Sequence, residues 1–477
     1  MSAWGVNGSA RSCDALLKRV EANDPTLKEL VILPLKIFES KDLRRLANAL
    51  RSNTHLTTLN ASGHHIDDVE SLEELGRSLA SQSLSPMTEL AIGDSQMGDA
   101  GVKALCRGLK SRNNLKLETI DLSWKGISSE GFATLLCVLG TLPSLKFLNL
   151  AQNDDVGPFF DFSSCPLPLF PNLTMLDLSK CGLNAETCCS LVKAIGAVES
   201  GSRRNTPLSL KFDSNDLRDH EYFYEMLIYL CEHPILADLY ISGCELGDEG
   251  LRQMINCGRH CIATKAVSSL QVLDLADNNL SSAVLCDFFT EVLRTESKYS
   301  LLSHLRKLNL SGNTLDEKSC KQLAASITEG RLQYLHELDV TRTFCGVNGA
   351  MALVQCNLND PSQCSLKVLT LFGNKLGSDG FVQLSKALEG GHPMLESLDL
   401  GGNDATEAGV VALLQALTST STTANVLRLL VVGGNQGGDT VEALVKEIKR
   451  KHPGLDIARD NPGKNRNNVP TGTSWMS

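Results

Sequence analysis

Two short stretches of this sequence contain residue types that could bind a nucleotide or a metal. Residues 433–440, GGNQGGDT, have the glycine spacing of a phosphate-binding loop, but Asp439 stands where such a loop needs a lysine. Cys257, His260 and Cys261 offer metal-ligating atoms about one helical turn apart. A structural zinc ion needs four ligands, and no fourth follows nearby in the sequence. We therefore expect no nucleotide, no metal and no cofactor.

Nucleophilic catalysis has no recognisable residue set either. The ten histidines do not pair in the sequence with a candidate serine or cysteine nucleophile. We therefore expect no enzyme activity.

The composition is that of a folded intracellular protein. The chain has 477 residues, 42% of them apolar and 21% charged, with a formal net charge of -10. The acidic balance argues against a general nucleic-acid binder. No apolar run is long enough to span a membrane, and the first residues, MSAWGVNGSARSCDALL, lack the pattern of a secretory signal. We expect a cytoplasmic protein, with the nucleus and the cytoskeleton left open, whose 16 cysteines are free thiols.

A repeat of about 31 residues runs through most of the chain. LQVLDLADNNL begins at Leu270, LRKLNLSGNTL at Leu305 and LKVLTLFGNKL at Leu366, and each fits the pattern L-x-x-L-x-L-x-x-N/C-x-L. The second half of each repeat carries apolar residues three and four apart, which predicts a helix. With relaxed matches the repeat starts are Leu27, Leu56, Met87, Leu117, Leu145, Leu173, Pro207, Leu236, Leu270, Leu305, Leu335, Leu366, Leu395 and Leu427.

Each place of the pattern has a physical role. Leucines at the first, fourth and sixth places point inward from a short strand, because side chains alternate along an extended chain. The Asn or Cys at the ninth place ends the strand and can satisfy backbone groups that the turn leaves unpaired. The residues at this place are Asn153, Cys181, Asn215, Cys244, Asn278, Asn313, Asn374, Asn403 and Asn435.

One strand and one helix cannot bury their apolar faces alone, so neighbouring repeats must stack. We predict an α/β fold, a right-handed solenoid (horseshoe) with a parallel sheet on its concave face and helices on its convex face. Repeats of this length with full helices resemble the ribonuclease-inhibitor-like class of leucine-rich repeat proteins, which includes inhibitors, scaffolds, cytoskeletal regulators and a GTPase activator. We expect residues 1–26 to form a helical cap, residues 27–451 the solenoid of about 14 repeats, and residues 452–477 a flexible polar tail.

Two further resemblances imply other functions. Residues 14–33 and 43–62 resemble the start of the tropomodulin repeat domain, with a helix, an Asn-Asp-Pro turn and a first strand. This resemblance implies an actin-cytoskeleton or cilium-associated regulator, although the final amphipathic helix of that family is missing. Residues 153–158, NDDVGP, resemble the N-x-x-G-P turn of the Ran GTPase-activating family. That family commonly ends in a long acidic tail, whereas this chain ends in a basic one.

The third, fifth and seventh places of each repeat should face solvent on the concave surface. Five aspartates and one lysine stand in the fifth-place column, and aromatic side chains lie among and beside these places. We predict that a protein partner, possibly basic, binds a free monomer on this surface, with no nucleic acid and no membrane involved. The expected contact residues are Trp124, Phe147, Asp177, Tyr240, Asp274, Asp339 and Phe372. The alternative is that Asp after Leu belongs to the repeat pattern whatever the protein binds.

Irregular segments offer other docking sites. Residues 156–172 contain four prolines and four phenylalanines where a helix is expected, and prolines at this density prevent one. This segment either covers the neighbouring helices or forms an apolar docking patch. Longer repeats insert residues between a helix and the next strand, at 199–206, 258–269 and 295–304. These insertions either serve as recognition loops or are extra loop length that the fold tolerates.

Overall fold

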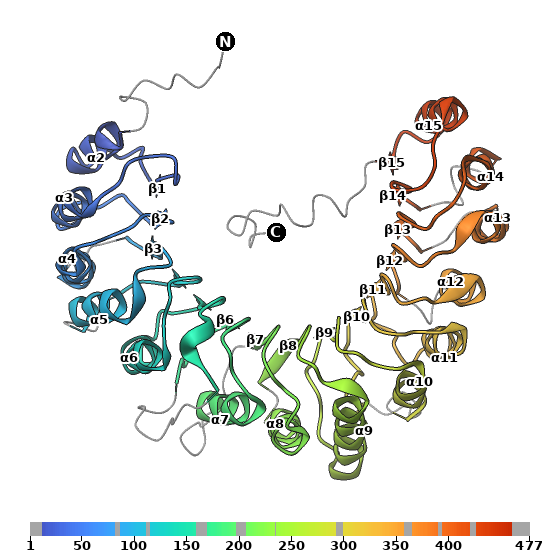
Figure 1. The fold of residues 1–477 in the computed structure, drawn as a ribbon, viewed down its shortest axis with the longest axis horizontal. Coiled ribbons are helices and arrows are strands. Elements are labelled where there is room, and N and C mark those ends of the chain that lie inside the picture. Colours follow the sequence, from blue (N-terminus) through green and yellow to red (C-terminus); the bar gives the residue numbers. More distant parts are fainter. Residues whose placement is uncertain are drawn as a thin grey trace. The chain divides into compact units, whose positions relative to one another are not determined.

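The computed structural model describes residues 12–81, 86–110, 115–158, 169–196, 207–233, 235–291, 299–356, 365–389, 394–419 and 426–459. Contacts divide the chain into two compact units, Met1–Cys244 and Glu245–Ser477. In each unit, short strands alternate with helices along the chain (Figure 1).

The first unit consists of consecutive parallel strands with helices between them. Its strands are β1 (Glu29–Val31), β2 (Thr58–Ser62), β3 (Glu89–Gly93), β4 (Thr119–Asp121), β5 (Phe147–Asn149), β6 (Met175–Asp177), β7 (Leu208–Lys211) and β8 (Leu236–Tyr240). Its helices are α2 (Asp14–Glu21), α3 (Ser40–Leu50), α4 (Val69–Ser81), α5 (Gly98–Leu109), α6 (Ser129–Leu139), the 3-10 helix η1 (Asp154–Val156), α7 (Ala185–Gly196) and α8 (His220–Glu232).

The second unit has the same construction. Its strands are β9 (Val272–Asp274), β10 (Lys307–Asn309), β11 (Glu337–Asp339), β12 (Val368–Thr370), β13 (Ser397–Asp399), β14 (Leu429–Val431) and β15 (Asp456–Ala458). Its helices are α9 (Gly247–Thr264), α10 (Ser282–Glu291), α11 (Glu317–Thr328), α12 (Gly346–Gln355), α13 (Gly377–Leu388), α14 (Glu407–Ser419) and α15 (Asp439–Lys451).

The predicted α/β repeat fold is confirmed. All fourteen predicted repeat starts precede or coincide with a strand, and within each unit every strand pairs in parallel with the next one in sequence. The pairing joins equal places of neighbouring repeats: Leu308 of β10, for example, lies opposite Leu338 of β11. Such leucines are buried, while the third, fifth and seventh places face the other way. We call the surface formed by these places, together with the turns that follow them, the strand side.

The ninth-place asparagines join each repeat to the one before it. Asn374 is 2% exposed, and its Nδ2 donates to the carbonyl oxygens of Val340 at 2.8 Å and Leu371 at 3.0 Å. Its Oδ1 accepts from the backbone N–H groups of Thr343 at 3.0 Å and Cys345 at 3.3 Å. One amide thus satisfies four groups that the turns leave unpaired. The predicted structural role of the ninth place is confirmed.

Cysteines contribute to the core as free thiols. The described cysteines form no disulfide bond with one another, and all but Cys137 and Cys286 are buried. At the ninth place, the thiols of Cys181 and Cys244 donate to the carbonyl oxygens of Leu150 at 3.2 Å and Phe212 at 3.1 Å, in the preceding repeats. In these two repeats the thiol therefore makes the bond to the preceding repeat that an asparagine Nδ2 makes elsewhere.

A short helix closes the first unit at its N-terminal end. The guanidinium of Arg45 in α3 binds Asp14 at 2.6 Å and also Glu21, so α2 is held by both of its ends. The amide of Asn53 donates to the carbonyl oxygen of Val20 at 3.1 Å. This helix lies inside the predicted cap of residues 1–26, whose boundary remains a prediction.

The C-terminal prediction was wrong in part. Residues 456–458 form β15, which pairs with β14, and Leu455 and Ile457 are each 4% exposed. These two apolar side chains cover the last repeat, but the polar residues around them hide this role in the sequence. The predicted flexible tail therefore cannot begin at residue 452, and residues 460–477 lie outside the described part.

The predicted insertions also have a different outcome where the structure describes them. Residues 258–264 extend α9, so most of the insertion expected at 258–269 is helix. Residues 159–168, 197–206 and 292–298, which contain most of the other irregular segments, lie outside the described residues. Within the described part of the chain, no helix is both long enough and apolar enough to span a membrane.

Candidate partner-binding surface

All seven predicted contact residues lie on the strand side of their own unit. In the first unit, Phe147 occupies a third place, Asp177 and Tyr240 fifth places, and Trp124 an eighth place, in the turn after β4. In the second unit, Asp274 and Asp339 occupy fifth places and Phe372 a seventh place. Their role in binding a partner remains a prediction.

The fifth-place aspartates have a structural role that explains their recurrence. In each case Oδ1 accepts a hydrogen bond from the backbone N–H two residues further along, at 2.9 Å from Ser123 to Asp121 and 2.8 Å from Gly401 to Asp399. Asn149 and Asn309 make the same bond. Such a turn ends the strand, so the repeat pattern alone favours Asp or Asn here.

The second carboxylate oxygen of these aspartates is often occupied by the next strand. Oδ2 of Asp121 accepts from Asn149 Nδ2 at 3.2 Å, and Oδ2 of Asp274 accepts from Asn309 Nδ2 at 2.9 Å. Burial raises the pKa of Asp274, although its hydrogen bonds from Ala276 and Asn309 oppose this effect. The carboxylates are thus fixed in place before any partner arrives.

A lysine interrupts the acidic column in the first unit. Lys211 lies between Asp177 and Tyr240 in the register of β6, β7 and β8. Its Nζ is 3.9 Å from Asp177 Oδ2 and 5.2 Å from the centre of the Tyr240 ring. The side chains of Lys211 and Asp177 are 13% and 15% exposed, so this ion pair is shielded from water. Two of the predicted contacts therefore form one cluster with the lysine, which reduces the negative charge there.

Trp124 is the most unusual residue of the strand side. It is 64% exposed, and its backbone has a φ of 56°, in the left-handed region. Other repeats place glycine here, as at Gly243 and Gly312, or a polar side chain in the same left-handed conformation, as at Gln152 and Arg342. The N–H of Trp124 donates to the Ala151 carbonyl oxygen at 2.8 Å, which holds the turn against the next repeat.

Phe147 adds a second exposed aromatic ring to the first unit. It is 37% exposed and pairs in register with Met175 of β6. Both side chains stand at third places, so they share one face of the sheet. The first unit therefore has two exposed aromatic side chains on a hydrogen-bonded backbone, Trp124 and Phe147, and Met175 lies beside Phe147.

In the second unit, glycines make room for an aromatic ring. A Cβ atom added to Gly401 or Gly402 would lie 2.9 Å from ring carbons of Phe372, so this ring lies against the turn after β13. The sequence analysis missed Phe344, which is 57% exposed and has Lys375 Nζ 5.2 Å from its ring centre. It stands at the tenth place, which strand alternation does not cover.

A buried lysine was missed as well. Lys125 occupies the ninth place of its repeat, where asparagine is usual, and is 2% exposed. Its Nζ donates to Ser62 Oγ at 2.9 Å and to the Ser123 carbonyl oxygen at 2.8 Å. Burial lowers the pKa of Lys125, while Asp121 and Asp94 oppose this effect. The sequence could have revealed this residue, because the ninth place of the pattern is Asn or Cys and a lysine there is an exception.

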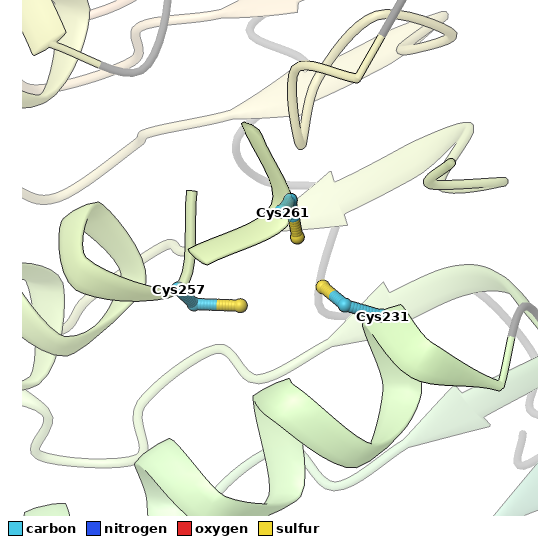
Figure 2. A group of neighbouring side chains, drawn as sticks. All are labelled: Cys231, Cys257 and Cys261. Carbon is cyan, nitrogen blue, oxygen red and sulfur yellow. The ribbon is translucent and has the colours of Figure 1, made fainter. Parts of the chain in front are cut away.

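The cysteines considered as metal ligands are part of the core. Cys257 and Cys261 lie one turn apart on the buried side of α9 (Figure 2). His260 is half-buried. Figure 2 also labels Cys231, a buried residue of α8. Two thiols of one helix are fewer ligands than a structural zinc site requires.

The residue that begins the GTPase-activating resemblance belongs to the asparagine ladder. Asn153 is 1% exposed, and its amide donates to the carbonyl oxygens of Leu122 and Leu150. Its Oδ1 accepts from the N–H groups of Lys125 and Ile127. This side chain is therefore fully used inside the fold.

The chain has recognisable relatives. A family model described as leucine-rich repeat matches residues 83–106, 302–324 and 391–414. Ribonuclease inhibitor from Mus musculus is 27% identical over 391 residues, covering 79% of this chain and 77% of the inhibitor. The inhibitor from Sus scrofa is 26% identical over 386 residues, with the same coverage.

Among solved structures, an internalin from Listeria monocytogenes aligns with 93% of this chain and 88% of its own, at 15% identity and a TM-score of 0.37. Together with the repeat pattern, the two inhibitor sequences show that the chain is similar to ribonuclease-inhibitor-like leucine-rich repeat proteins.

Proposed function

We propose that this protein is a non-enzymatic binding module that holds a partner protein on its strand side. The observation that carries this proposal is Trp124, a large apolar side chain exposed from a left-handed backbone position. A bulky residue in this conformation costs on the order of 1–2 kcal/mol of folding free energy. Gln152, Lys180 and Arg342 share this backbone position, so it is the exposed indole that distinguishes Trp124 from the other repeats.

The chemistry of the first unit suits an aromatic-centred contact. Exposed Trp and other aromatic side chains supply much of the binding free energy in protein interfaces, provided that surrounding contacts exclude water. Trp124 and Phe147 are held on hydrogen-bonded turns and strands, so little conformational entropy is lost when they bind. The cluster of Asp177, Lys211 and Tyr240 provides polar groups that are already oriented.

The second unit suits a basic part of the partner. Asp274 and Asp339 stand two strands apart in one column, with Asn309 between them, and Asp399 follows two strands further on. The fifth places of β9 to β14 contain no cation. Hydrogen bonds from backbone N–H groups favour the ionised form of these carboxylates, although at Asp274 burial is the larger effect and raises the pKa. As carboxylates, these side chains can attract basic groups of a partner. Ribonuclease inhibitor is named for acting on a ribonuclease, which supports a protein as the partner. The acidic column makes a basic protein our preferred partner class.

No described contact favours the rival functions. The buried ladder position of Asn153 leaves its amide unable to reach a nucleotide or a GTPase. The α2 cap is held by Arg45 of this chain, which explains the tropomodulin-like helix and turn without an actin contact. We further propose a cytoplasmic monomer when no partner is bound.

The test is affinity capture with the purified full chain. Wild type and the Trp124→Asn variant are immobilised in parallel, since asparagine tolerates the left-handed backbone. Tyr334→Asn is the matched control, because Tyr334 is an exposed aromatic residue (45%) that lies before β11, outside the strand side. Proteins retained from an extract are quantified by mass spectrometry, and pancreatic ribonuclease A serves as a defined basic probe.

Wild type and Tyr334→Asn should retain the same proteins, which Trp124→Asn should lose. Retained proteins should elute progressively between about 0.05 and about 0.5 M NaCl, because the Debye length shortens in this range. Equal capture by wild type and Trp124→Asn would contradict the role of Trp124. Salt-insensitive capture would contradict the basic-partner class while leaving the aromatic contact in place.

A further inference from the structure

The turn after β4 departs from the repeat pattern at two adjacent places. Trp124 is the only tryptophan at an eighth place, and Lys125 is the only lysine at a ninth place. Trp124 is exposed, whereas Lys125 is only 2% exposed. One turn therefore exposes an indole and buries the side chain of the next residue.

Backbone hydrogen bonds join the turns of neighbouring repeats in a regular row. The N–H at the eighth place of one repeat donates to the carbonyl oxygen at the seventh place of the next. In the first unit such bonds, each 2.8 Å long, join Gly63 to Gly93, Trp124 to Ala151, Gln152 to Ser179 and Lys180 to Asp213. Each of these turns is therefore fixed by the turn that follows it.

This row is interrupted directly before Trp124. By the register of β3 and β4, the N–H of Asp94 should donate to the carbonyl oxygen of Ser123, but the described residues show no such bond. The Ser123 carbonyl oxygen instead accepts from Lys125 Nζ at 2.8 Å. A side chain of the turn itself thus replaces a bond from the preceding repeat.

The peptide group between Ser123 and Trp124 is consequently held at both of its polar atoms. Its carbonyl oxygen accepts from Lys125 Nζ, and its N–H donates to the Ala151 carbonyl oxygen. The same Nζ also donates to Ser62 Oγ at 2.9 Å, two repeats earlier, which fixes the ammonium group. Because a peptide group is planar, bonds at its two opposite atoms fix its orientation and with it the Cα atom of Trp124.

This arrangement is unfavourable for stability. Both acceptors of Lys125 Nζ are neutral oxygens, while Asp121 and Asp94 interact with it only through their charge. A buried cation without a counter-ion in contact destabilises a fold. An asparagine at the ninth place would instead join two repeats, as Asn374 does. The lysine is therefore better explained by the turn that it fixes than by a gain in stability.

We propose that Lys125 is a positioning residue for partner binding: its ammonium group fixes the peptide group of Trp124 and so the direction in which the indole projects. This proposal rests on the function proposed above, in which Trp124 contacts the partner. A side chain that is fixed before binding loses less conformational entropy when the partner arrives. Loss of the ammonium group should therefore weaken partner binding about fivefold, although the indole is still present.

The first test needs no partner. Replacing Trp4 and Trp475 with phenylalanine leaves Trp124 as the single tryptophan, whose motion is measured by time-resolved fluorescence anisotropy. Lys125→Met should increase the amplitude of the nanosecond motion of the indole and speed the hydrogen exchange of the Trp124 amide. Lys110→Met, the same change at an exposed lysine directly after α5, should alter neither. Unchanged anisotropy and exchange in Lys125→Met would overturn the proposal.

The second test compares binding with stability. The probes are pancreatic ribonuclease A and the captured protein most enriched on wild type over Trp124→Asn. Lys125→Met should bind a probe about fivefold more weakly than wild type and Lys110→Met do, while its urea midpoint at pH 7 does not fall. Binding and midpoint that fall together would reduce Lys125 to a structural residue and overturn the proposal, as would unchanged binding. Equal capture by wild type and Trp124→Asn would contradict the proposed function alone, because the anisotropy of Trp124 does not depend on a partner.

Discussion

Removing one asparagine of the ladder should destabilise the second unit locally. Asn313 is 2% exposed, and its Nδ2 donates to the carbonyl oxygens of Leu275 at 2.8 Å and Leu310 at 3.0 Å. Its Oδ1 accepts from the N–H groups of Asn278 and Leu280, both at 3.1 Å. Asn313→Ala deletes these four bonds and a longer one, of 3.4 Å, to the Ser311 carbonyl oxygen. The Leu310 carbonyl oxygen keeps the bond that it accepts from the backbone N–H at position 313, at 3.3 Å.

The magnitude follows from these four bonds. A net contribution of about 1 kcal/mol for each hydrogen bond gives a loss of about 4 kcal/mol in the free energy of unfolding. Water that enters the site would reduce the loss, so we expect about 3 kcal/mol or more. Asn256→Ala is the control: this asparagine is exposed on α9, and its replacement should change the free energy by less than about 0.5 kcal/mol.

Urea unfolding followed by circular dichroism measures the global effect, and hydrogen exchange measures the local one. In Asn313→Ala the amides of Asn278 and Leu280 should lose protection before those of the first unit do. Unchanged protection of these two amides, together with an unchanged urea midpoint, would refute the ladder as a source of stability.

Two other substitutions test the packing and the buried charge of the first unit. A Cβ atom at Gly108 would clash with the Glu73 carbonyl oxygen. Gly108→Ala should therefore force α4 and α5 apart and lower the free energy of unfolding by about 2 kcal/mol. Gly454→Ala is the control: its Cβ would lie in open space, so the thermal midpoint should not change. Lys125→Met should stabilise the protein at pH 7, because burial lowers the pKa of this lysine below 10.5. Between the folded pKa and 10.5 the unfolded wild type binds more protons, so its stability rises with pH. The advantage of Lys125→Met in urea unfolding should therefore shrink towards pH 10.5, and a constant advantage would contradict the lowered pKa.

Much of the fold could be predicted because each repeat satisfies a local rule. The leucine spacing located every strand of the fourteen repeats, and the ninth place identified side chains such as Asn374 that bind two repeats at once. The final strand, β15, was missed because Leu455 and Ile457 stand among polar residues and no apolar helical pattern follows them in the sequence.

Contacts between repeats were harder to predict than the repeats themselves. The placement of Lys211 between Asp177 and Tyr240 depends on which side chains share a register across three strands. The number of aspartates suggested an acidic surface, but their Oδ1 atoms accept backbone hydrogen bonds in the turns that end the strands. Leu35, at the ninth place of the first repeat, is 85% exposed because no repeat precedes it in the described part of the chain, and a pattern within one repeat cannot reveal this.

Photo-cross-linking tests the central proposal most directly. p-Benzoylphenylalanine is introduced in place of Phe147 on the strand side or in place of Arg107, an exposed residue of α5. Each full chain is irradiated with a partner identified by capture. The proposal predicts a cross-linked product from position 147 and none from position 107. A product from position 107 alone would place the partner on the helices and contradict binding on the strand side.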